Sequence, residues 1–389
     1  MQTTSSTRLP VIDFLRGCAL FGILVVNVWV FSTSFIGYAT WTTFFTSPFD
    51  ELMMGLSALL FEQRFVGVFA LVFGVSIAIQ QERFAEQEHS FGKYFVKRSL
   101  VFMGLGVLNI LLFFWGDILL IYGVLSLLFY PLMRLSNKVL LWIAAVIFLI
   151  PTLLFLSTPF KLMFHEYEEG IRQYYTPESL TQTYQSGTFT EMSIARVREY
   201  LSYNAFNLLW QRTALSCIIV GYVMGRSQLQ YNYVLYKKRM LWILVGCVVY
   251  AIAFLSYFFL GYNKLLPHEL FFSLHALFIP ISIFIYVALL LGVYHLRVLQ
   301  KLVQYIADMG RLSLSNYFFQ SVVCCFLFTN AGLSWYYHTT PVSNLLVALG
   351  VFILQLLVTQ LYLRKFITGP LEVLMRRLTT SVHKGTSMQ

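Results

Sequence analysis

The sequence is poor in charge: Asp, Glu, Lys and Arg make up only 11% of its 389 residues, while 58% are hydrophobic and 17% aromatic. No soluble domain of this size needs that much apolar surface, so the composition excludes an ordinary soluble fold. The formal net charge is +10, but the basic residues lie between apolar runs. Membrane orientation therefore explains them better than nucleic-acid binding does.

Several motifs of familiar chemistry are missing. There is no HExxH, P-loop or GxSxG element, which argues against a membrane protease, an ATPase or an α/β-hydrolase. The five cysteines fall inside apolar runs and form no CxxC pair, so neither a disulfide framework nor a metal site is predicted. The sequence also has no internal repeat, and thus lacks the repeat signature of many transporters.

What the sequence has instead is a series of long apolar runs. A bilayer core needs about 20 apolar residues per helix, which predicts an all-α, polytopic membrane bundle of about ten transmembrane helices. The predicted spans are 10–32, 54–80, 97–115, 118–134, 138–159, 206–226, 240–262, 268–294, 312–332 and 341–363. The second run carries Glu62 and Arg64, and one interpretation splits it into an interfacial or re-entrant segment and the true span.

These spans predict one transmembrane domain over residues 1–379, followed by a disordered tail at 380–389. The segment 160–200 is expected as an inserted extracytoplasmic loop that folds into short helices over the outer face. Segments 297–308 and 369–377 are amphipathic and are expected at the membrane interface. The first run lacks a clean small-x-small cleavage site, so we expect it to stay in the mature protein.

Lys and Arg residues predict the orientation of the bundle. With a cytoplasmic N-terminus, 19 of the 27 basic residues fall in inside segments, 5 in outside segments and 3 within the membrane. Cytoplasmic loops are enriched in Lys and Arg. Both termini are therefore predicted to be cytoplasmic.

Polar residues within the predicted spans fall at two depths. At a rise of about 1.5 Å per residue, the outer group consists of Asn27, Arg64, Asn109, Asp117, Arg212 and His275. Lipid tolerates such residues poorly, so we expect them around a polar cavity open to the outside. Arg64 and Arg212 would bind an anionic or carbonyl oxygen, and a neutral His275 would act as a general base. In the alternative, Asp117 pairs with one arginine only to lock helices together, and His275 is a core histidine.

The second group of polar residues lies toward the inner face. Asp13 and Arg16 are three residues apart on the first helix, close enough to pair. The other members are Arg226, Arg311, Ser313, Ser315, Asn316 and Gln320. Clustered arginines suit phosphate, which makes this level a candidate vestibule for a phosphate-bearing donor. Ordinary interface anchoring is the alternative, above all for Arg226 and Arg311.

A set of short stretches recurs along the chain in a specific combination. They are Asp13-x-x-Arg16-Gly17-x-Ala19-Leu20-x-Gly22-Ile23 ending in Asn27, Phe65-x-x-x-Phe69 leading to Leu71-x-Phe73-Gly74, Lys97-Arg98 before Gly104-x-Gly106, Gly116-Asp117-Ile118-Leu119-x-x-Tyr122, Trp210-Gln-Arg212-Thr213, Gly310-Arg311-x-x-Leu314-x-Asn316-Tyr317-x-x-Gln320-Ser321 and Gly369-Pro370-Leu371-Glu372. Together they resemble the YeiB-like (DUF418 domain) family of bacterial inner-membrane proteins, from about Arg8 to Thr379.

That family resembles a larger superfamily of transmembrane acyltransferases, which includes the acyltransferase-3 enzymes and the heparan-α-glucosaminide N-acetyltransferases. The resemblance implies a multi-pass inner-membrane protein that moves an acyl group from cytosolic acyl-CoA to an extracytoplasmic sugar or envelope component. Asp117 would orient or accept a proton, with His275 as the reserve base, while Arg64 and Arg212 stabilise negative charge. Arg16 and Arg311 would meet the donor phosphates. The expected substrate contacts are Asn27, Asn109, Asn316 and Gln320.

The sequence departs from the relatives at two positions. Acyltransferase-3 proteins carry a histidine about a dozen residues after the first-helix arginine, where this chain has Asn27. Many YeiB-like proteins have a histidine shortly before the Gly-Asp-Ile-Leu stretch, where this chain has Asn109. Either His275 or Asp117 substitutes as the base, or acyl transfer has been lost.

Two other functions therefore stay open beside acyl transfer. One is a transporter or flippase for a small anionic or lipid-linked solute, which would use the same arginines for binding only. The other is a non-catalytic envelope-stress or assembly factor. The expected partners are membrane lipid and a small-molecule or glycan acceptor, with no nucleic acid, and a homodimer is left open.

Overall fold

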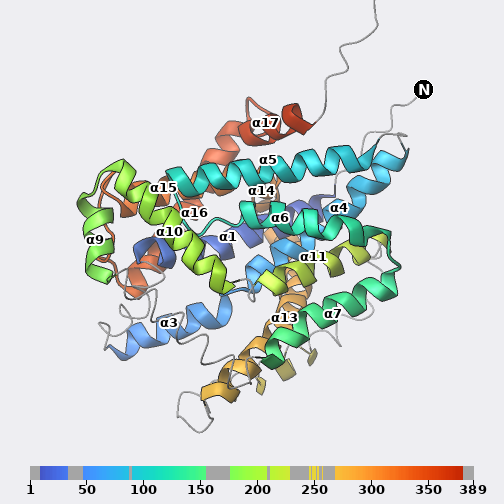
Figure 1. Cartoon of the computed structure of the whole chain (residues 1–389), viewed down its shortest axis with the longest axis horizontal. Helices are drawn as coiled ribbons and strands as arrows, with labels where there is room; N and C mark the ends of the chain where they lie inside the picture. Colours follow the sequence, from blue (N-terminus) through green and yellow to red (C-terminus); the bar gives the residue numbers. More distant parts are fainter. Residues whose placement is uncertain are drawn as a thin grey trace, which may run out of the picture.

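The computed structural model describes residues 9–33, 47–86, 90–154, 176–207, 211–227, 245–246, 248–250, 252–253, 256 and 268–379. Every regular element in these ranges is a helix (Figure 1). In the first half of the chain the helices are α1 (Pro10–Ser32), α3 (Pro48–Leu60), α4 (Arg64–Glu86), α5 (Phe91–Leu112), α6 (Leu119–Phe129), the 3-10 helix η1 (Tyr130–Arg134) and α7 (Asn137–Leu154). In the second half they are α9 (Pro177–Ser186), α10 (Phe189–Asn207), α11 (Gln211–Arg226), α13 (His268–Tyr294), η3 (Arg297–Leu299), α14 (Gln300–Arg311), α15 (Ser313–Phe328), α16 (Pro341–Leu363) and α17 (Pro370–Thr379).

The all-helical class is confirmed, and four described helices are long and apolar enough to cross a membrane: α1, Arg64–Ala85 of α4, α5 and α16. A fifth candidate joins Phe278–Tyr294 to Arg297–Arg311, across a bend of 80°. Leu119–Arg134, Asn137–Leu149 and Ser313–Phe328 are apolar but shorter. The structure thus supports a membrane protein with several apolar helices, while the count of ten stays a prediction. The predicted span at 240–262 and the tail at 380–389 lie mostly or wholly outside the described residues.

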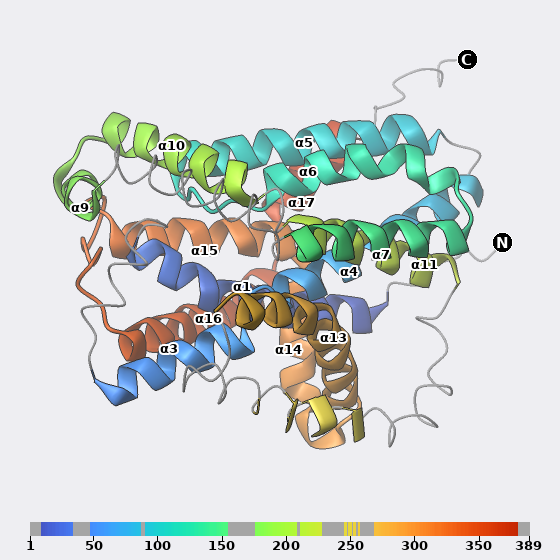
Figure 2. The same ribbon diagram turned by 60° about the horizontal axis from the view of Figure 1, so that its bottom comes forward.

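Helix α1 lies at the centre of the bundle, in contact with α4, α13, α14, α15 and α16 (Figure 2). Pro10 stands in its first turn, where a missing backbone N–H costs nothing. Two glycines let α14 approach α1 very closely. A Cβ on Gly17 would lie 2.1 Å from the Ile306 carbonyl oxygen, and one on Gly310 would lie 1.8 Å from that of Asp13. Only hydrogen fits between the two backbones.

Glycines also join α4 to α11. A Cβ on Gly221 would lie 2.0 Å from the Leu71 carbonyl oxygen, and one on Gly74 would lie 2.1 Å from that of Ile218. The sequence predicts close helix packing, as small residues generally provide in membrane helices, at six glycines: Gly67, Gly74, Gly104, Gly106, Gly221 and Gly225. The prediction is confirmed for five of them and is wrong for Gly104, where a Cβ would meet nothing within 4 Å.

Three predictions about local structure are confirmed in the described residues. The second apolar run is split, because α3 ends at Leu60 and α4 begins at Arg64, with Gln63 at a φ of +60° between them. The predicted outer loop contains the helical hairpin α9–α10. Segments 297–308 and 369–377 contain η3–α14 and α17.

Candidate functional site

The turn between α5 and α6 buries a carboxyl group. Asp117 is 2% exposed and accepts hydrogen bonds from Asn109 Nδ2 (2.7 Å) and Tyr317 Oη (3.3 Å) at Oδ2, and from the Leu120 backbone N–H (2.9 Å) at Oδ1. A side chain at position 106 would destroy this arrangement, since a Cβ on Gly106 would lie 2.6 Å from Asp117 Oδ1. We call Asp117, Asn109 and Tyr317 the carboxyl centre.

Burial raises the pKa of Asp117 to about 6, although its hydrogen bonds from the Leu120 backbone, Asn109 and Tyr317 act in the opposite direction. Removing water disfavours the charged carboxylate, and donors to the carboxylate favour it. A carboxyl group with a pKa near 6 can exchange a proton close to neutral pH, which is the property of a general acid or base.

Aromatic side chains lead from the carboxyl centre into the bundle. The Tyr317 hydroxyl accepts from the Ile118 backbone N–H at 3.2 Å, and the Ile118 carbonyl accepts from the Tyr122 backbone N–H at 2.9 Å. The Tyr122 hydroxyl donates to the Val66 carbonyl at 3.0 Å. The Tyr122 ring lies edge-on to Phe73, with centroids 5.3 Å apart. Arg98 in turn lies over Phe73, with Cζ 4.8 Å from the ring centroid. This series of contacts, which starts at Asp117, therefore ends at the buried guanidinium group of Arg98.

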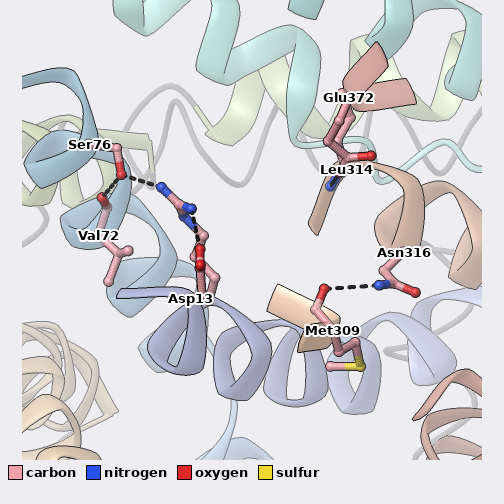
Figure 3. A network of polar contacts seen from close by, with 8 residues as sticks. Asp13, Val72, Ser76, Met309, Leu314, Asn316 and Glu372 are labelled. Carbon is pink, nitrogen blue, oxygen red and sulfur yellow. Dashed lines mark hydrogen bonds and ion pairs between the residues drawn. The ribbon is translucent and has the colours of Figure 1, made fainter. Parts of the chain in front are cut away.

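Arg98 belongs with Arg16 to a second cluster, the arginine pair. Arg16 Nη1 donates to Asp13 Oδ1 at 3.0 Å, and Nη2 donates to the Ser76 hydroxyl, which itself donates to the Val72 carbonyl at 2.6 Å (Figure 3). The predicted pairing of Asp13 with Arg16 is confirmed. Arg98 lies over Phe73, three residues before the Ser76 that Arg16 contacts on the same helix, so both guanidinium groups lie against one stretch of α4. Two guanidinium groups beside one carboxylate leave a net positive charge that favours an anion.

A buried polar ladder joins α15 to α16. Asn316 Nδ2 donates to the Met309 carbonyl at 2.9 Å (Figure 3), and the Asn316 carbonyl accepts from Gln355 Nε2 at 2.7 Å. Gln320 Nε2 donates to Gln355 Oε1 at 2.9 Å. Asn316 and Gln320, predicted as substrate contacts, thus join two helices here.

Glu372, in the last of the quoted motifs, caps the N-terminal end of α15. Glu372 of α17 lies beside Leu314 (Figure 3) and accepts from its backbone N–H at 2.9 Å. It also accepts from the Ser315 backbone N–H at 3.2 Å and from the Ser315 hydroxyl. A carboxylate at this place satisfies backbone donors that the helix leaves unpaired and complements the helix dipole. Nearby, Arg311 donates to the Ile367 carbonyl, so its described contact anchors the segment before α17.

The remaining predicted residues lie elsewhere. Arg64 is buried at the start of α4 and donates to the Glu62 carbonyl at 2.8 Å, and buried Arg212 lies over Phe148, 5.6 Å from the ring centroid. Neither arginine is among the partners of Asp117 in the described part of the chain. Asn27 is half-buried on α1. His275 belongs to α13, but its side chain lies outside the described residues.

Sequence reasoning missed several of these participants. Tyr122, Tyr317, Arg98 and Glu372 all stand in the quoted motifs, so motif membership was a usable signal for them. Ser76 stands in no motif, and only the tertiary contact with Arg16 identifies it. In the described residues no group of His, Cys, Asp and Glu side chains is placed to hold a metal ion.

Helix α10 covers the end of α5 next to the carboxyl centre. Arg196 Nη1 and the Ser193 hydroxyl both donate to the Leu111 carbonyl, at 3.2 and 2.9 Å. The α5–α6 turn is therefore shielded rather than open at the surface.

The fold and these clusters define a helical membrane protein with a carboxyl centre and an arginine pair linked by aromatic residues. The family model described as protein of unknown function (DUF418) matches residues 208–381. YxaH of Bacillus subtilis (strain 168) is 25% identical over 395 residues, covering 97% of this chain and 95% of YxaH. YeiB of Escherichia coli (strain K12) is 26% identical over 395 residues, covering 96% of each chain.

Residues 208–381 thus match the DUF418 model, and the chain is similar to YxaH and YeiB over nearly its whole length. No solved structure matches it.

Proposed function

We propose that this protein is a transmembrane acyltransferase of the bacterial inner membrane. It takes an acyl group from cytosolic acyl-CoA and passes it to a hydroxyl group of an extracytoplasmic sugar or envelope component. The observation that carries the proposal is the connection between an arginine pair suited to an anion and a buried carboxyl group with a raised pKa. Neither cluster alone favours acyl transfer.

The arginine pair supports the donor end of the reaction. Coenzyme A carries phosphate groups, and guanidinium groups bind phosphate through paired, charge-assisted hydrogen bonds. Arg16 is held in place by Asp13 and Ser76, and Arg98 lies over both the Phe73 and Phe102 rings. Arg98 thus joins Arg16 as a proposed phosphate ligand, while Arg311 keeps that role only as a prediction from the motif.

The carboxyl centre supports the acceptor end. Ionised Asp117 would remove the proton from the acceptor hydroxyl as its oxygen attacks the acyl carbonyl carbon. The new C–O ester bond forms, the C–S thioester bond breaks, and coenzyme A leaves as a thiolate that takes up a proton. Asn109 and Tyr317 hold the carboxylate in place during the transfer. Arg64, Arg212 and His275 remain proposed as groups that stabilise negative charge or act as a reserve base.

The test is thiol release from acyl-CoA by the purified protein in lipid nanodiscs. Asp117→Asn should lower the rate by about 10²-fold or more, the usual contribution of a general base. Asp50→Asn, on α3 and outside both clusters, should leave the rate unchanged. Acyl-CoA binding should survive in Asp117→Asn and weaken in Arg98→Gln, which separates donor binding from chemistry.

Two results would contradict the proposal. One is an unchanged rate in Asp117→Asn. The other is a wild-type protein that has no affinity for acyl-CoA but supports solute-dependent flux in vesicles, which would indicate the transporter or flippase instead.

A further inference from the structure

The two helices of the outer hairpin expose opposite kinds of side chain. On α9 the exposed positions include Ser179, Gln182 and Ser186, as expected for a helix in water. On α10 they include Phe189, Ile194 and Leu201, of which Ile194 is 46% and Leu201 61% exposed. The two helices are adjacent in the sequence, yet α9 exposes polar side chains where α10 exposes large apolar ones.

Two charged residues of α10 point the other way, while Glu191 at its start and Arg198 stay exposed. Arg196 is 1% and Glu199 2% exposed, and Glu199 accepts a hydrogen bond from the buried Tyr184 hydroxyl of α9. Arg196 donates to the Leu111 carbonyl and lies 3.6 Å from Cys325 Sγ. A helix in water buries its apolar face and exposes its charges. The inverted pattern of α10 is that of a helix with a protein interior on one side and an apolar medium on the other.

The apolar face of α10 continues a surface that already belongs to the membrane. Helix α5 is one of the candidate spans and exposes Leu100, Val107, Leu108 and Leu111 along one side. Helix α10 packs against α5 and bonds to the carbonyl of Leu111 itself (Figure 2). The exposed apolar residues of α5 and the residues Ile194 and Leu201 of α10 therefore form one continuous apolar surface.

We propose that α10 is embedded in the outer leaflet, with the face formed by Ile194 and Leu201, and Phe189 at the start of the helix, against lipid acyl chains. Arg198 stands on this face between Ile194 and Leu201 and is exposed. Its long side chain reaches the phosphate of a headgroup while its methylene groups stay in the apolar layer. The hairpin is thus no extracytoplasmic loop in water, because only α9 lies outside the lipid. This inference does not depend on acyl transfer.

The experiment is spin-label accessibility in nanodiscs, on the full chain with Cys247→Ala, since the other four cysteines are buried. Labels are placed at Ile194→Cys and Leu201→Cys on α10. Leu108→Cys on α5 is the lipid control, and Gln182→Cys on α9 is the water control. Collisions with molecular oxygen report the apolar layer, and collisions with a water-soluble nickel chelate report solvent.

Labels at positions 194 and 201 should collide more with oxygen than with the chelate, as at position 108, while position 182 shows the reverse. Chelate access at 194 and 201 equal to that at 182 would overturn the proposal. Low access to both reagents, with an immobilised label, would also overturn it, because a second protein surface would then cover α10. Phe189→Cys replaces either variant that fails to give a monodisperse protein.

Discussion

Asp117 is a residue whose surroundings decide its chemistry. An aspartate in water is ionised at all but acidic pH, whereas burial raises the pKa of this one to about 6. Asn109 and Tyr317 hold the ionised form in one orientation. Because position 109 is an asparagine, which does not titrate, the carboxyl group itself is the group of this centre that titrates near neutral pH.

The pH dependence of acyl transfer follows from that value. Protonation removes the lone pair that accepts the acceptor's proton, so the rate should fall as pH is lowered through about 6 and level off above it. Asn109→Ala removes a donor to the ionised form, which raises the pKa of Asp117 further and moves the midpoint of the profile to higher pH. It should also cost about 1–3 kcal/mol of stability by leaving a buried acceptor with one donor fewer.

The matched control for this prediction is Asn344→Ala. Asn344 is equally buried and donates to the Ser32 hydroxyl at 2.9 Å, away from Asp117. It should lower the melting temperature while leaving the midpoint of the pH profile in place. A midpoint that moves equally in both variants would show that Asn109 acts only through general stability.

At the scale of the helix, glycine decides which elements can approach. Gly17 and Gly310 bring α14 against the backbone of α1, next to Asp13 and therefore next to the arginine pair. The capping contact of Glu372 fixes α17 to α15 close by. The short amphipathic helices α14 and α17 thus fix the positions of α1 and α15, which carry residues of the site.

Gly310→Ala should destabilise the protein by about 1–3 kcal/mol, because its Cβ meets the Asp13 backbone, which cannot yield as a flexible side chain can. Gly104→Ala on α5 is the control, since its Cβ would meet nothing within 4 Å. That variant should be neutral or gain about 0.5–1 kcal/mol from helix propensity. Apparent melting temperatures in detergent measure both, and equal losses would rule out the close contact as the cause.

Glu372→Gln tests the cap of α15. The charge-assisted bonds to the Leu314 and Ser315 N–H groups weaken, at an expected cost of about 1–2 kcal/mol in partly buried surroundings. Glu191→Gln is the matched control, because Glu191 bonds the Thr188 N–H at the exposed start of α10, where water can take its place. A melting temperature that drops no more in Glu372→Gln than in Glu191→Gln would contradict the prediction.

On the scale of the whole molecule, two clusters with different chemistry lie at different places along the bundle: the arginine pair, which suits an anion, and the carboxyl centre, which can exchange a proton. The arginine pair and the carboxyl centre are joined through Phe73, Tyr122 and Tyr317, and helices from distant parts of the sequence supply the two ends. An acyl transfer across a membrane requires that these ends face opposite compartments. Orientation is therefore the property on which the proposed function depends.

The 19-to-5 bias of Lys and Arg predicts that both termini are cytoplasmic. Green fluorescent protein fused after Gln389 should fluoresce, and alkaline phosphatase fused there should be inactive. Alkaline phosphatase inserted between residues 160 and 175 should be active. The opposite pattern would place the arginine pair outside, beyond the reach of cytosolic acyl-CoA.

The sequence alone determined what depends on composition and short spacing. Apolar runs predicted the membrane class and the helical fold, and the three-residue spacing predicted the Asp13–Arg16 pair. The charged residues Glu62 and Arg64 predicted the break in the second run. The motifs predicted the similarity to the YeiB-like family. These features depend on solvent preference and local geometry, which a linear sequence contains.

The tertiary structure alone decided which polar groups meet. Equal depth grouped Arg64 and Arg212 with Asp117, but depth says nothing about rotation around a helix axis, and the described partners of Asp117 are Asn109, Tyr317 and a backbone N–H. Polarity placed α10 in an outer loop, while its buried Arg196 and Glu199 emerged only from packing. Which face of a helix turns inward depends on every neighbour at once, and that information is not local.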